Sequence, residues 1–421
     1  MRKKLGVIFG GVSCEHDISI ITGVMTVNAA SVRHDVVPIY IDGSGQWLTG
    51  KDFNKTDTFL CGIFGSSKSE KSGRTKDGKD RLKLKAKKVH LRPSSNWLYS
   101  DNGRPYKWLD AVVICNHGLN GEDGSLSGLL QLAGIPYAGS GVLASAVGMD
   151  KITQKRIFEH AGFTVTPFAA VEKWETENKL YDMVTRVGKL GFPLMLKPSN
   201  LGSSIGIVRA NDYKELFDGL NQAFEWDERV LVEQALDGFT ELNCAVLGAG
   251  ARVVASEVEE PVLSDGGFLS FKDKYVRKDS GGSLRGSKDS AGTGSGVSGA
   301  ITERRQLSKG ATGRYLPARI SAELREEVQD TAKAVFRLIG CSGVARVDFL
   351  LKDSKLYVNE INTVPGSLSS YLFAFDGMGF PLLIDKLLAA AFDVFEKKKK
   401  LKYTYDSNVL KAALGTGSKT V

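Results

Sequence analysis

The chain has 421 residues, of which 42% are hydrophobic and 25% are charged, and its formal net charge is +8. This length allows two or three globular domains, while no apolar run approaches the ~18 residues of a membrane span and no signal-peptide pattern opens the chain. The five cysteines are scattered without C-x-x-C spacing, which favours a cytoplasmic protein and argues against disulfides or a zinc site.

Most of the positive charge lies in one segment. Residues 68–88 contain ten Lys or Arg and three Asp or Glu, a local charge of +7. The segment is rich in Ser, Gly and Lys and poor in apolar residues, which predicts a solvated basic excursion at about 65–95. Because no aromatic residues alternate with the basic ones, we expect no nucleic-acid partner, and we expect no membrane partner either.

Residues 1–147 are predicted to form an α/β domain. The apolar strand 5–10 runs into a glycine turn and then a helix, a unit typical of a doubly wound parallel sheet, whose ligands bind at the carboxyl ends of the strands. The helix has its apolar positions at Ile18, Ile21, Met25 and Ala29. Glu15 in the turn suits a cationic amine, although an acid here would also favour the helix N-terminus.

A second apolar strand, 111–115, ends in the loop NHGLNGEDG at 116–124. A turn explains the glycines of this loop. It does not explain why His117 lies beside two acids, so the loop is a candidate binding segment.

Residues 148–240 are predicted to form a second domain. Asp150 is placed to cap the helix that carries Lys151. The strand 193–197 ends in Lys197 and continues into the Gly/Ser loop 198–206, an arrangement that can hold phosphates through an ammonium and backbone N–H groups. The loop lacks the P-loop pattern, and a plain hairpin turn explains it equally well.

The region after the strand 230–234 predicts a further domain, 241–400, followed by a tail at 401–421. Glu241 lies shortly after that strand, but acids at strand ends are common. The long Gly- and Ser-rich stretch that follows is interpreted as a lid loop at 259–278 and a mobile insertion at 279–312. A helix over 322–339 then leads to the last motif.

The apolar runs 344–351 and 356–361 flank a polar turn and predict a β-hairpin. Arg346 and Asp348 share one face of their strand, and Glu360 and Asn362 share one face of theirs. If the strands pair in register, three oxygen donors and a guanidinium converge, a set that suits Mg²⁺ and the anion it holds. The alternative is an edge hairpin whose polar side chains face solvent.

Together these motifs resemble the D-alanine:D-alanine ligases of the ATP-grasp superfamily. The resemblance runs from Leu5 to about Phe395, and it implies an α/β (α+β) ATP-grasp fold with an N-terminal doubly wound domain. The matching segments are GGVSCEH, HGLNGEDGSLSG, MDK, LKPSNLGSSIG, EQ with the later Glu241, KY, GVARVDF and NEINTVPG.

The resemblance implies a nucleotide site with two Mg²⁺ or Mn²⁺ ions. Glu360 would bridge the two metals, and Lys274 would reach the γ-phosphate. The other metal ligands would be Asp348 and Asn362. The other ATP-binding residues would be Lys151, Lys197, Ser204, Glu233, Ala235, Leu236, Glu241, Phe268 and Asn359.

The resemblance also implies a substrate site. Glu15 would bind the ammonium of the first D-alanine, and it would join Ser203 and Tyr275 in a set that locks the lid. Arg346 and the Gly366 N–H would stabilise the oxyanion of the tetrahedral intermediate. The remaining substrate contacts are assigned to His117, Ser367 and Leu368.

The implied function is ATP-dependent ligation of two D-alanines through a D-alanyl phosphate, for peptidoglycan precursors, by a homodimer. Ligases that use D-serine or D-lactate as second substrate share the fold, and the Lys274–Tyr275 pair resembles the D-alanine type more than the D-lactate type. A non-catalytic ATP-binding regulator is the alternative from a different class.

Overall fold

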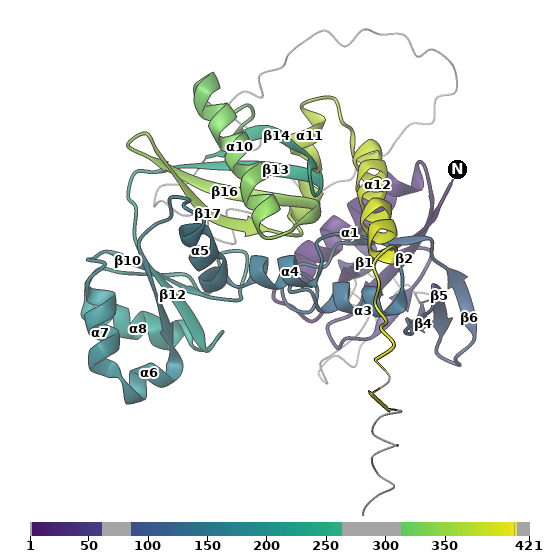
Figure 1. Cartoon of the computed structure of the whole chain (residues 1–421), viewed down its shortest axis with the longest axis horizontal. Coiled ribbons are helices and arrows are strands. Elements are labelled where there is room, and N and C mark those ends of the chain that lie inside the picture. Colours follow the sequence, from purple (N-terminus) through teal and green to yellow (C-terminus); the bar gives the residue numbers. More distant parts are fainter. Residues whose placement is uncertain (1, 61–85, 263–312, 408, 411–421) are drawn as a thin grey trace, which may run out of the picture.

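A computed structural model describes residues 2–60, 86–262, 313–407 and 409–410. Within these ranges the chain forms three β-sheets, which follow one another along the sequence and each carry their own helices (Figure 1). The expected mixed α/β architecture is confirmed.

The N-terminal sheet has the strand order β6-β5-β4-β3-β2-β1-β7-β8. The four strands β2, β1, β7 and β8 are parallel, and β3 to β6 extend the sheet in antiparallel fashion. Its elements are β1 (Lys4–Gly10), α1 (His16–Ser31), β2 (Asp35–Ile41), β3 (Trp47–Thr49), α2 (Asp57–Leu60), β4 (Lys87–His90), β5 (Trp97–Ser100), β6 (Pro105–Trp108), β7 (Ala111–Ile114), α3 (Ser125–Ala133) and β8 (Tyr137–Ala138).

Strand β4 corrects the far end of the predicted basic excursion. Residues 65–85 of that excursion lie outside the described residues, but 87–90 form an ordered strand rather than a solvated loop. Val89 is buried while Lys87 and Lys88 are exposed, and the ammonium of Lys87 lies 4.4 Å from the ring centroid of Tyr106. One buried apolar residue after two exposed lysines is enough for a strand that has partners on both sides.

The predicted helix is confirmed as α1, but two of the apolar positions expected on its buried face are exposed. Ile21 and Met25, which were expected in the core, are 44% and 41% exposed. The buried face instead contains small and hydroxyl-bearing residues, including Thr22 and Gly23. Gly23 packs so closely on Phe9 that an added Cβ would lie 2.2 Å from the ring, so no larger side chain fits at this position.

The central sheet is antiparallel, with the order β11-β10-β12-β9. The capping role predicted for Asp150 is confirmed, because its Oδ1 accepts a hydrogen bond from the Thr153 N–H at 2.7 Å. The segment before β10 forms two helices, α6 and α7, with Lys179 between them. The elements are α4 (Val142–Met149), α5 (Lys151–His160), β9 (Phe168–Glu172), α6 (Lys173–Asn178), α7 (Leu180–Gly188), β10 (Leu194–Pro198), β11 (Val208–Ala210), α8 (Tyr213–Ala223) and β12 (Arg229–Gln234).

The C-terminal sheet is also antiparallel, with the order β15-β14-β13-β16-β17. The predicted hairpin is confirmed as β16 and β17, and its two turn residues have φ of +48° and +59°, as hairpin turns of this length require. The elements are β13 (Thr240–Ala249), β14 (Arg252–Pro261), β15 (Arg314–Tyr315), α10 (Ala322–Leu338), β16 (Ser342–Lys352), β17 (Lys355–Asn362), η1 (Gly366–Ser369), α11 (Ser370–Ala374) and α12 (Phe380–Lys399).

The predicted lid loop and insertion fall mostly outside the described residues. This applies to 263–278 of the loop, with Phe268, Lys274 and Tyr275, and to the insertion 279–312. The start of the loop was placed too early, since 259–261 belong to β14 and pair with β15.

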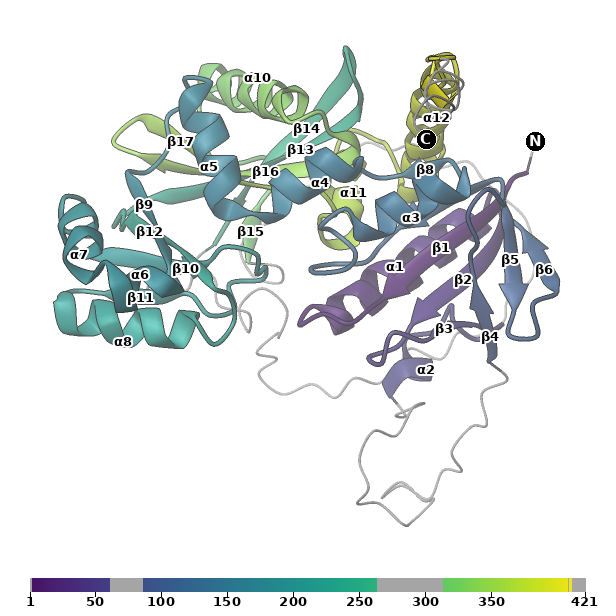
Figure 2. The ribbon, with the colours of Figure 1, turned by 60° about the horizontal axis from the view of Figure 1, so that its bottom comes forward.

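Helix α12 joins the first and last parts of the chain (Figure 2). Its Leu383 and Leu387 belong to the same apolar core as Leu5 and Val7 of β1. At one end of this contact His34 Nε2 lies 2.8 Å from Asp385 Oδ1. The N-terminal sheet therefore does not have a core of its own, because a helix from the other end of the chain closes it.

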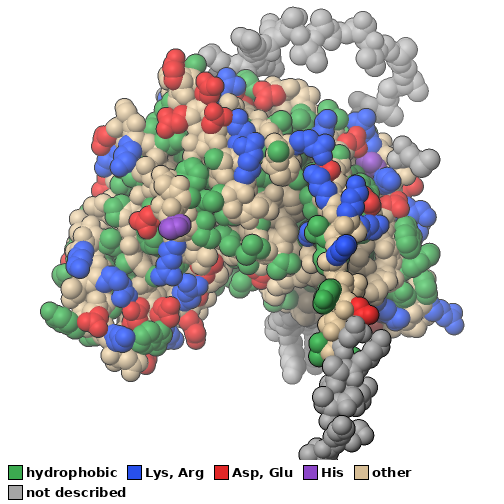
Figure 3. Space-filling model, viewed as in Figure 1, with side chains coloured by type: hydrophobic (Ala, Val, Ile, Leu, Met, Phe, Trp, Pro, Cys, Tyr) green, Lys and Arg blue, Asp and Glu red, His purple; other side chains and the backbone are tan. Residues whose placement is uncertain are grey.

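The surface in Figure 3 carries charges of both signs. Lys and Arg side chains gather over α12, and Asp and Glu side chains gather at one end of α10. No helix among the described residues is long and apolar enough to cross a membrane.

Gly23 offers a test of the close packing between α1 and β1. Gly23→Ala should lower the thermal unfolding midpoint, because overpacking of a tight contact costs about 1–3 kcal/mol. Gly128→Ala in α3 is the matched control, since its Cβ would meet only Val142 at 3.7 Å and alanine favours a helix by about 0.5–1 kcal/mol. Differential scanning calorimetry should give a lower midpoint for the first variant only. Equal midpoints would contradict the packing argument.

Candidate functional site

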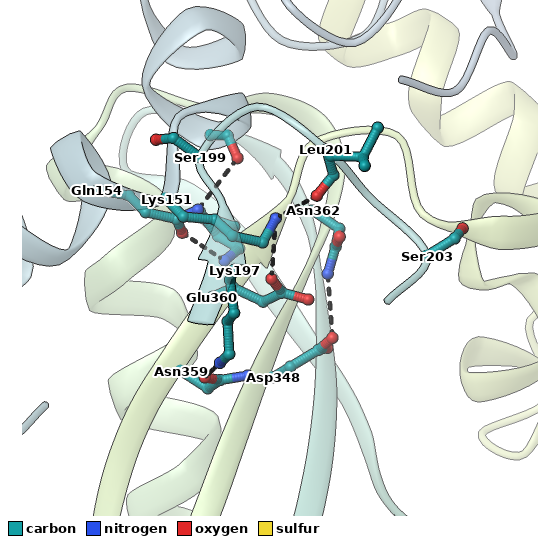
Figure 4. A network of polar contacts seen from close by, with 12 residues as sticks. Lys151, Gln154, Lys197, Ser199, Leu201, Ser203, Asp348, Asn359, Glu360 and Asn362 are labelled. Atoms are coloured by element: carbon teal, nitrogen blue, oxygen red, sulfur yellow. Dashed lines mark hydrogen bonds and ion pairs between the residues drawn. The ribbon is translucent and has the colours of Figure 1, made fainter. Parts of the chain in front are cut away.

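The candidate site lies where the turn after β1, the loop after β10 and the end of the β16–β17 hairpin meet. Figure 4 shows Lys151, Lys197, Glu360 and Asn359 pointing toward one another from α5, β10 and β17. Because β10 and β17 belong to different sheets, packing between the sheets determines how these side chains meet.

The hairpin brings together the polar residues predicted from the sequence. Asp348 lies directly opposite Glu360, and Arg346 lies opposite Asn362. Arg346 Nε and Nη2 donate to the two Asp348 oxygens at 2.6 and 2.7 Å, and Asn362 Nδ2 donates to Asp348 Oδ2 at 3.0 Å. Burial alone would lower the pKa of Arg346, but Asp348 outweighs burial and raises it well above the ordinary value. The solvated-hairpin alternative is therefore wrong, since Asp348 is buried.

Two lysines from the central domain face the same hairpin. Lys151 Nζ lies 3.4 Å from Glu360 Oε2 and donates to the Leu201 carbonyl at 2.9 Å. Lys197 Nζ lies 3.5 Å from Asn359 Oδ1, and Asn359 stands at the bulge in the β16–β17 register. The site thus has cations next to both of its carboxylates.

The donor set fits a divalent cation such as Mg²⁺. Asp348, Glu360 and Asn362 supply hard oxygen ligands on adjacent strands, the type and number that Mg²⁺ takes when phosphates and water complete its coordination. Only two of the three are carboxylates. This agrees with the finding that no group of three His, Cys, Asp or Glu side chains suited to a metal occurs among the described residues.

Glu233 is buried between two lysines. Lys155 Nζ lies 2.5 Å from one Glu233 oxygen, and Lys197 Nζ lies 2.5 Å from the other. Burial would raise the pKa of Glu233, but the two ammonium groups outweigh burial and hold it at about 2. Lys155 was not singled out from the sequence. Its spacing of four residues from Lys151 on one helix was the available signal.

The other predicted nucleotide contacts lie close to this buried cluster. Ala235 and Leu236 follow β12, and the Ala235 N–H donates to the Pro193 carbonyl at 2.9 Å. Glu241 on β13 is near enough to Lys197 to contribute to the raised pKa of that lysine, after Glu233 and Glu360. Ser204 lies in the loop after β10.

Glu15 connects the N-terminal domain to the loop after β10. It is buried, and its Oε1 accepts a hydrogen bond from Ser203. Gly202 is required beside it, because an added Cβ would lie 2.4 Å from Glu15 Oε2. The predicted pairing of Glu15 with Ser203 is therefore present, while the third member, Tyr275, lies outside the described residues.

His117 is packed against α1. Its Nε2 lies 2.9 Å from Thr22 Oγ1, and the same oxygen accepts the Ser367 N–H at 3.1 Å. Burial lowers the pKa of His117 to about 4, with Arg346 adding to the effect, so the imidazole is neutral at pH 7. A neutral ring holds the turn after β17 without adding positive charge beside Arg346.

Glu122 joins the loop 116–124 to the turn after β17, a role that the sequence did not reveal. Its Oε1 accepts the Val364 N–H at 3.0 Å, and its Oε2 accepts the Gly118 N–H at 3.3 Å. Burial raises the pKa of Glu122 to about 7, and the nearby Glu15 contributes. A carboxylate therefore positions the backbone just before Gly366.

Both loops of the site contain non-glycine residues in the left-handed region. Ser203 and Ser204 have φ of +54° and +59°, and Ser367, Leu368 and Ser369 have φ of about +50°. Such conformations cost free energy and persist where surrounding contacts impose them, most often at functional sites. The Leu368 side chain is buried in the apolar core, so only its backbone is available to a ligand.

A second charged cluster lies beside Arg346. The Tyr371 hydroxyl donates to Glu259 Oε2 at 2.7 Å, and Arg314 Nη1 lies 2.8 Å from Glu259 Oε1. The Arg314 guanidinium also covers the Tyr371 ring, 4.5 Å from its centroid. Tyr371 and Glu259 both help to raise the pKa of Arg346 after Asp348, so this cluster lies on the same side of the hairpin.

Comparison with known proteins gives consistent matches over nearly the whole chain. The family model "D-ala D-ala ligase N-terminus" matches residues 4–140, and "D-ala D-ala ligase C-terminus" matches 157–288 and 303–389. The D-alanine–D-alanine ligase of Thermosipho africanus is 34% identical over 410 residues, covering 96% of this chain and 98% of the relative. That of Caldicellulosiruptor bescii is 35% identical over 416 residues, covering 96% and 99%.

Two solved structures are similar throughout. The D-alanine–D-alanine ligase of Coxiella burnetii has a TM-score of 0.69 at 26% identity and covers 95% of this chain and 98% of its own. The D-Ala:D-Ser ligase of Enterococcus faecalis has a TM-score of 0.70 at 29% identity and covers 93% and 100%.

Glu122 predicts a pH dependence of stability. Because its pKa is raised from 4.5 to about 7, the native state holds this proton more tightly than the unfolded chain, and stability is lost as pH rises from about 4.5 to about 7. Glu122→Gln removes this pH-dependent loss of stability, because glutamine does not titrate. The thermal midpoint of the variant relative to the unmodified protein should therefore rise between pH 5 and pH 8. A constant difference across this range would contradict the raised pKa.

Proposed function

Because this chain belongs to the D-alanine–D-alanine ligase family, we propose that the residues gathered around the β16–β17 hairpin carry out the family's reaction. The protein is an ADP-forming ligase with an ATP-grasp fold that joins two D-alanines for peptidoglycan synthesis. The observation that carries the assignment of residues is the meeting of Arg346, Asp348 and Glu360 with two lysines of the central domain.

The proposed domains follow the three sheets. Residues 1–147 bind substrate, 148–240 cover the nucleotide, and 241–400 carry the catalytic hairpin, with 401–421 as a tail. We also propose a cytoplasmic homodimer.

The nucleotide is proposed to bind between the central sheet and the hairpin. Lys151 and Lys197 meet its phosphates, with Ser204, Asn359 and Lys274 nearby. Ala235, Leu236 and the Glu233 backbone meet the adenine along with Phe268, and Glu241 meets the ribose. Asp348, Glu360 and Asn362 would hold two Mg²⁺ or Mn²⁺ ions, which would offset the charge of the transferred phosphoryl group.

The first D-alanine is proposed to bind with its ammonium on Glu15. Burial raises the pKa of Glu122 and the nearby Glu15 adds to this shift, so a cation placed beside these two acids is favoured. The carboxylate of this substrate is a poor acyl donor because its leaving group would be an oxide. Transfer of the γ-phosphoryl group to it gives D-alanyl phosphate, whose leaving group is phosphate.

The second step is attack by the amine of the second D-alanine on the acyl carbon. A tetrahedral oxyanion forms, and Arg346 with the Gly366 N–H is proposed to stabilise it. A positioned donor of this kind typically contributes about 3–4 kcal/mol. Glu122 and His117 keep the turn that carries Gly366 in place, and collapse of the intermediate releases phosphate and the dipeptide. Closure of the lid, with Tyr275 joining Glu15 and Ser203, would exclude water from the acylphosphate.

The second substrate is proposed to be D-alanine, with D-serine as the alternative. The similarity to a D-Ala:D-Ser ligase at 29% identity favours testing both. Ser367 and the Leu368 backbone remain the proposed contacts of this substrate, and the Tyr371 cluster stands next to them.

ADP release with and without D-alanine tests the proposed function. ADP should form only when D-alanine is present, together with D-alanyl-D-alanine in equal amount, detected by mass spectrometry. A panel with D-serine and D-lactate as second substrate should give less product than D-alanine. ADP release that is independent of D-alanine would sink the proposal and leave an ATP-binding regulator.

Arg346→Ala tests the oxyanion role. The variant should lose at least about 10²-fold in kcat, because it removes a donor aimed at developing charge. Its ATP affinity should stay within a few-fold, since Lys151 and Lys197 are unchanged. Arg2→Ala, which breaks an exposed ion pair with Asp35 near the start of β1 and β2, serves as control. Full activity of Arg346→Ala would refute its assigned role.

A further inference from the structure

Lys155 is a buried lysine to which the reaction assigns no role. It is 1% exposed, and its ammonium contacts Glu233 at 2.5 Å and Thr166 Oγ1 at 2.6 Å. Thr166 in turn donates to the same Glu233 oxygen at 2.9 Å. A buried lysine is costly unless it is paired, so the arrangement must offset a large desolvation penalty.

The carboxylate that pairs with Lys155 is shared. Its second oxygen contacts Lys197 Nζ, which also reaches Asn359 on the hairpin. One buried carboxylate therefore faces two ammonium groups. Lys155 lies on the side of α5 and Thr166, whereas Lys197 lies on the side of the proposed nucleotide site.

We propose that Lys155 is a positioning residue that keeps Glu233 neutralised, so that the ammonium of Lys197 is available to the polyphosphate of a nucleotide. This inference rests on the proposed phosphate role of Lys197. In the absence of nucleotide, both lysines share Glu233. When the phosphates bind the ammonium of Lys197, Lys155 remains as the counterion of the buried Glu233 carboxylate.

The need for a second lysine follows from the charges. Without Lys155, Lys197 is the one lysine that directly contacts Glu233 among the described residues. A bound nucleotide then has two routes. Either Lys197 stays paired with Glu233 and does not reach the phosphates, or Lys197 turns to the phosphates and the buried Glu233 carboxylate loses the ammonium that contacts it. Both routes weaken phosphate binding, since breaking a buried ion pair from one side is strongly unfavourable.

The test compares ATP with adenosine by isothermal titration calorimetry on the full-length protein. Lys155→Met should weaken ATP binding at least about tenfold and leave adenosine binding unchanged, because only the phosphates use Lys197. Its thermal midpoint without nucleotide should not fall by more than about 3 °C, since a neutral buried pair remains. Arg156→Met removes an exposed cation from the next position on the same helix. It should change the affinity for neither ATP nor adenosine.

Two further variants separate charge from packing. Lys155→Gln keeps a polar side chain beside Glu233 and Thr166, so it reports the same loss of ATP affinity even if the Met variant folds poorly. The double variant Lys155→Met with Glu233→Gln frees Lys197 again, and it should bind ATP more tightly than Lys155→Met alone. A structural role of Lys155 predicts no such recovery.

The outcomes that overturn the inference are distinct from failure of the proposed function. ATP affinity of Lys155→Met and Lys155→Gln within twofold of the unmodified protein would overturn it, as would an equal loss for ATP and adenosine. Lys197→Met calibrates the result. Unchanged ATP affinity in that variant would instead show that Lys197 does not serve the phosphates, and the proposed nucleotide site itself would fail.

Discussion

The bidentate pair between Arg346 and Asp348 is the interaction on which the candidate site depends. Both groups are largely buried on β16, two residues apart on one face, and each makes the burial of the other tolerable. The pair also positions the guanidinium beside the turn that carries Gly366. A metal at Asp348 would compete with Arg346 for the same carboxylate, and the guanidinium would then turn toward a new anion. In this arrangement Arg346 occupies the position beside Asp348 that a metal ion would take.

The same principle of shared counterions extends across the sheets. Glu360 on the C-terminal sheet contacts Lys151, and Glu233 on the central sheet contacts Lys155 and Lys197. Glu15 and Glu122 link the N-terminal domain to the central loop and to the turn after β17. The polar contacts between the sheets are thus concentrated at the place where substrates are expected. Binding of an anionic nucleotide and a cationic amine would redistribute these contacts between the sheets.

The sequence predicted what local patterns encode. Two apolar runs around a short polar turn predicted the hairpin, and Asp150 before a helix predicted a cap. The buried face of α1 was partly missed because hydroxyl-bearing residues share it with apolar ones: Thr22 bonds to His117 and Ser367, both distant in the sequence. Lys155 was missed for a similar reason, because its partner Glu233 is 78 positions away and a lysine pattern alone indicates a solvated helix face. Family resemblance supplied the expected ligands, whereas contacts between sheets came only from the fold.

The left-handed serines show how the fold sustains local strain. Ser367 and Ser369 would be easier to accommodate as glycines, because their φ of about +50° lies in the left-handed region. Thr22 holds the Ser367 N–H, and Glu122 holds the Val364 N–H just before the turn. The buried Leu368 side chain adds an apolar anchor from the core that α12 completes. Because polar and apolar contacts both constrain this turn, the Gly366 N–H between them has little freedom, which is the condition an oxyanion donor must meet before the substrate arrives.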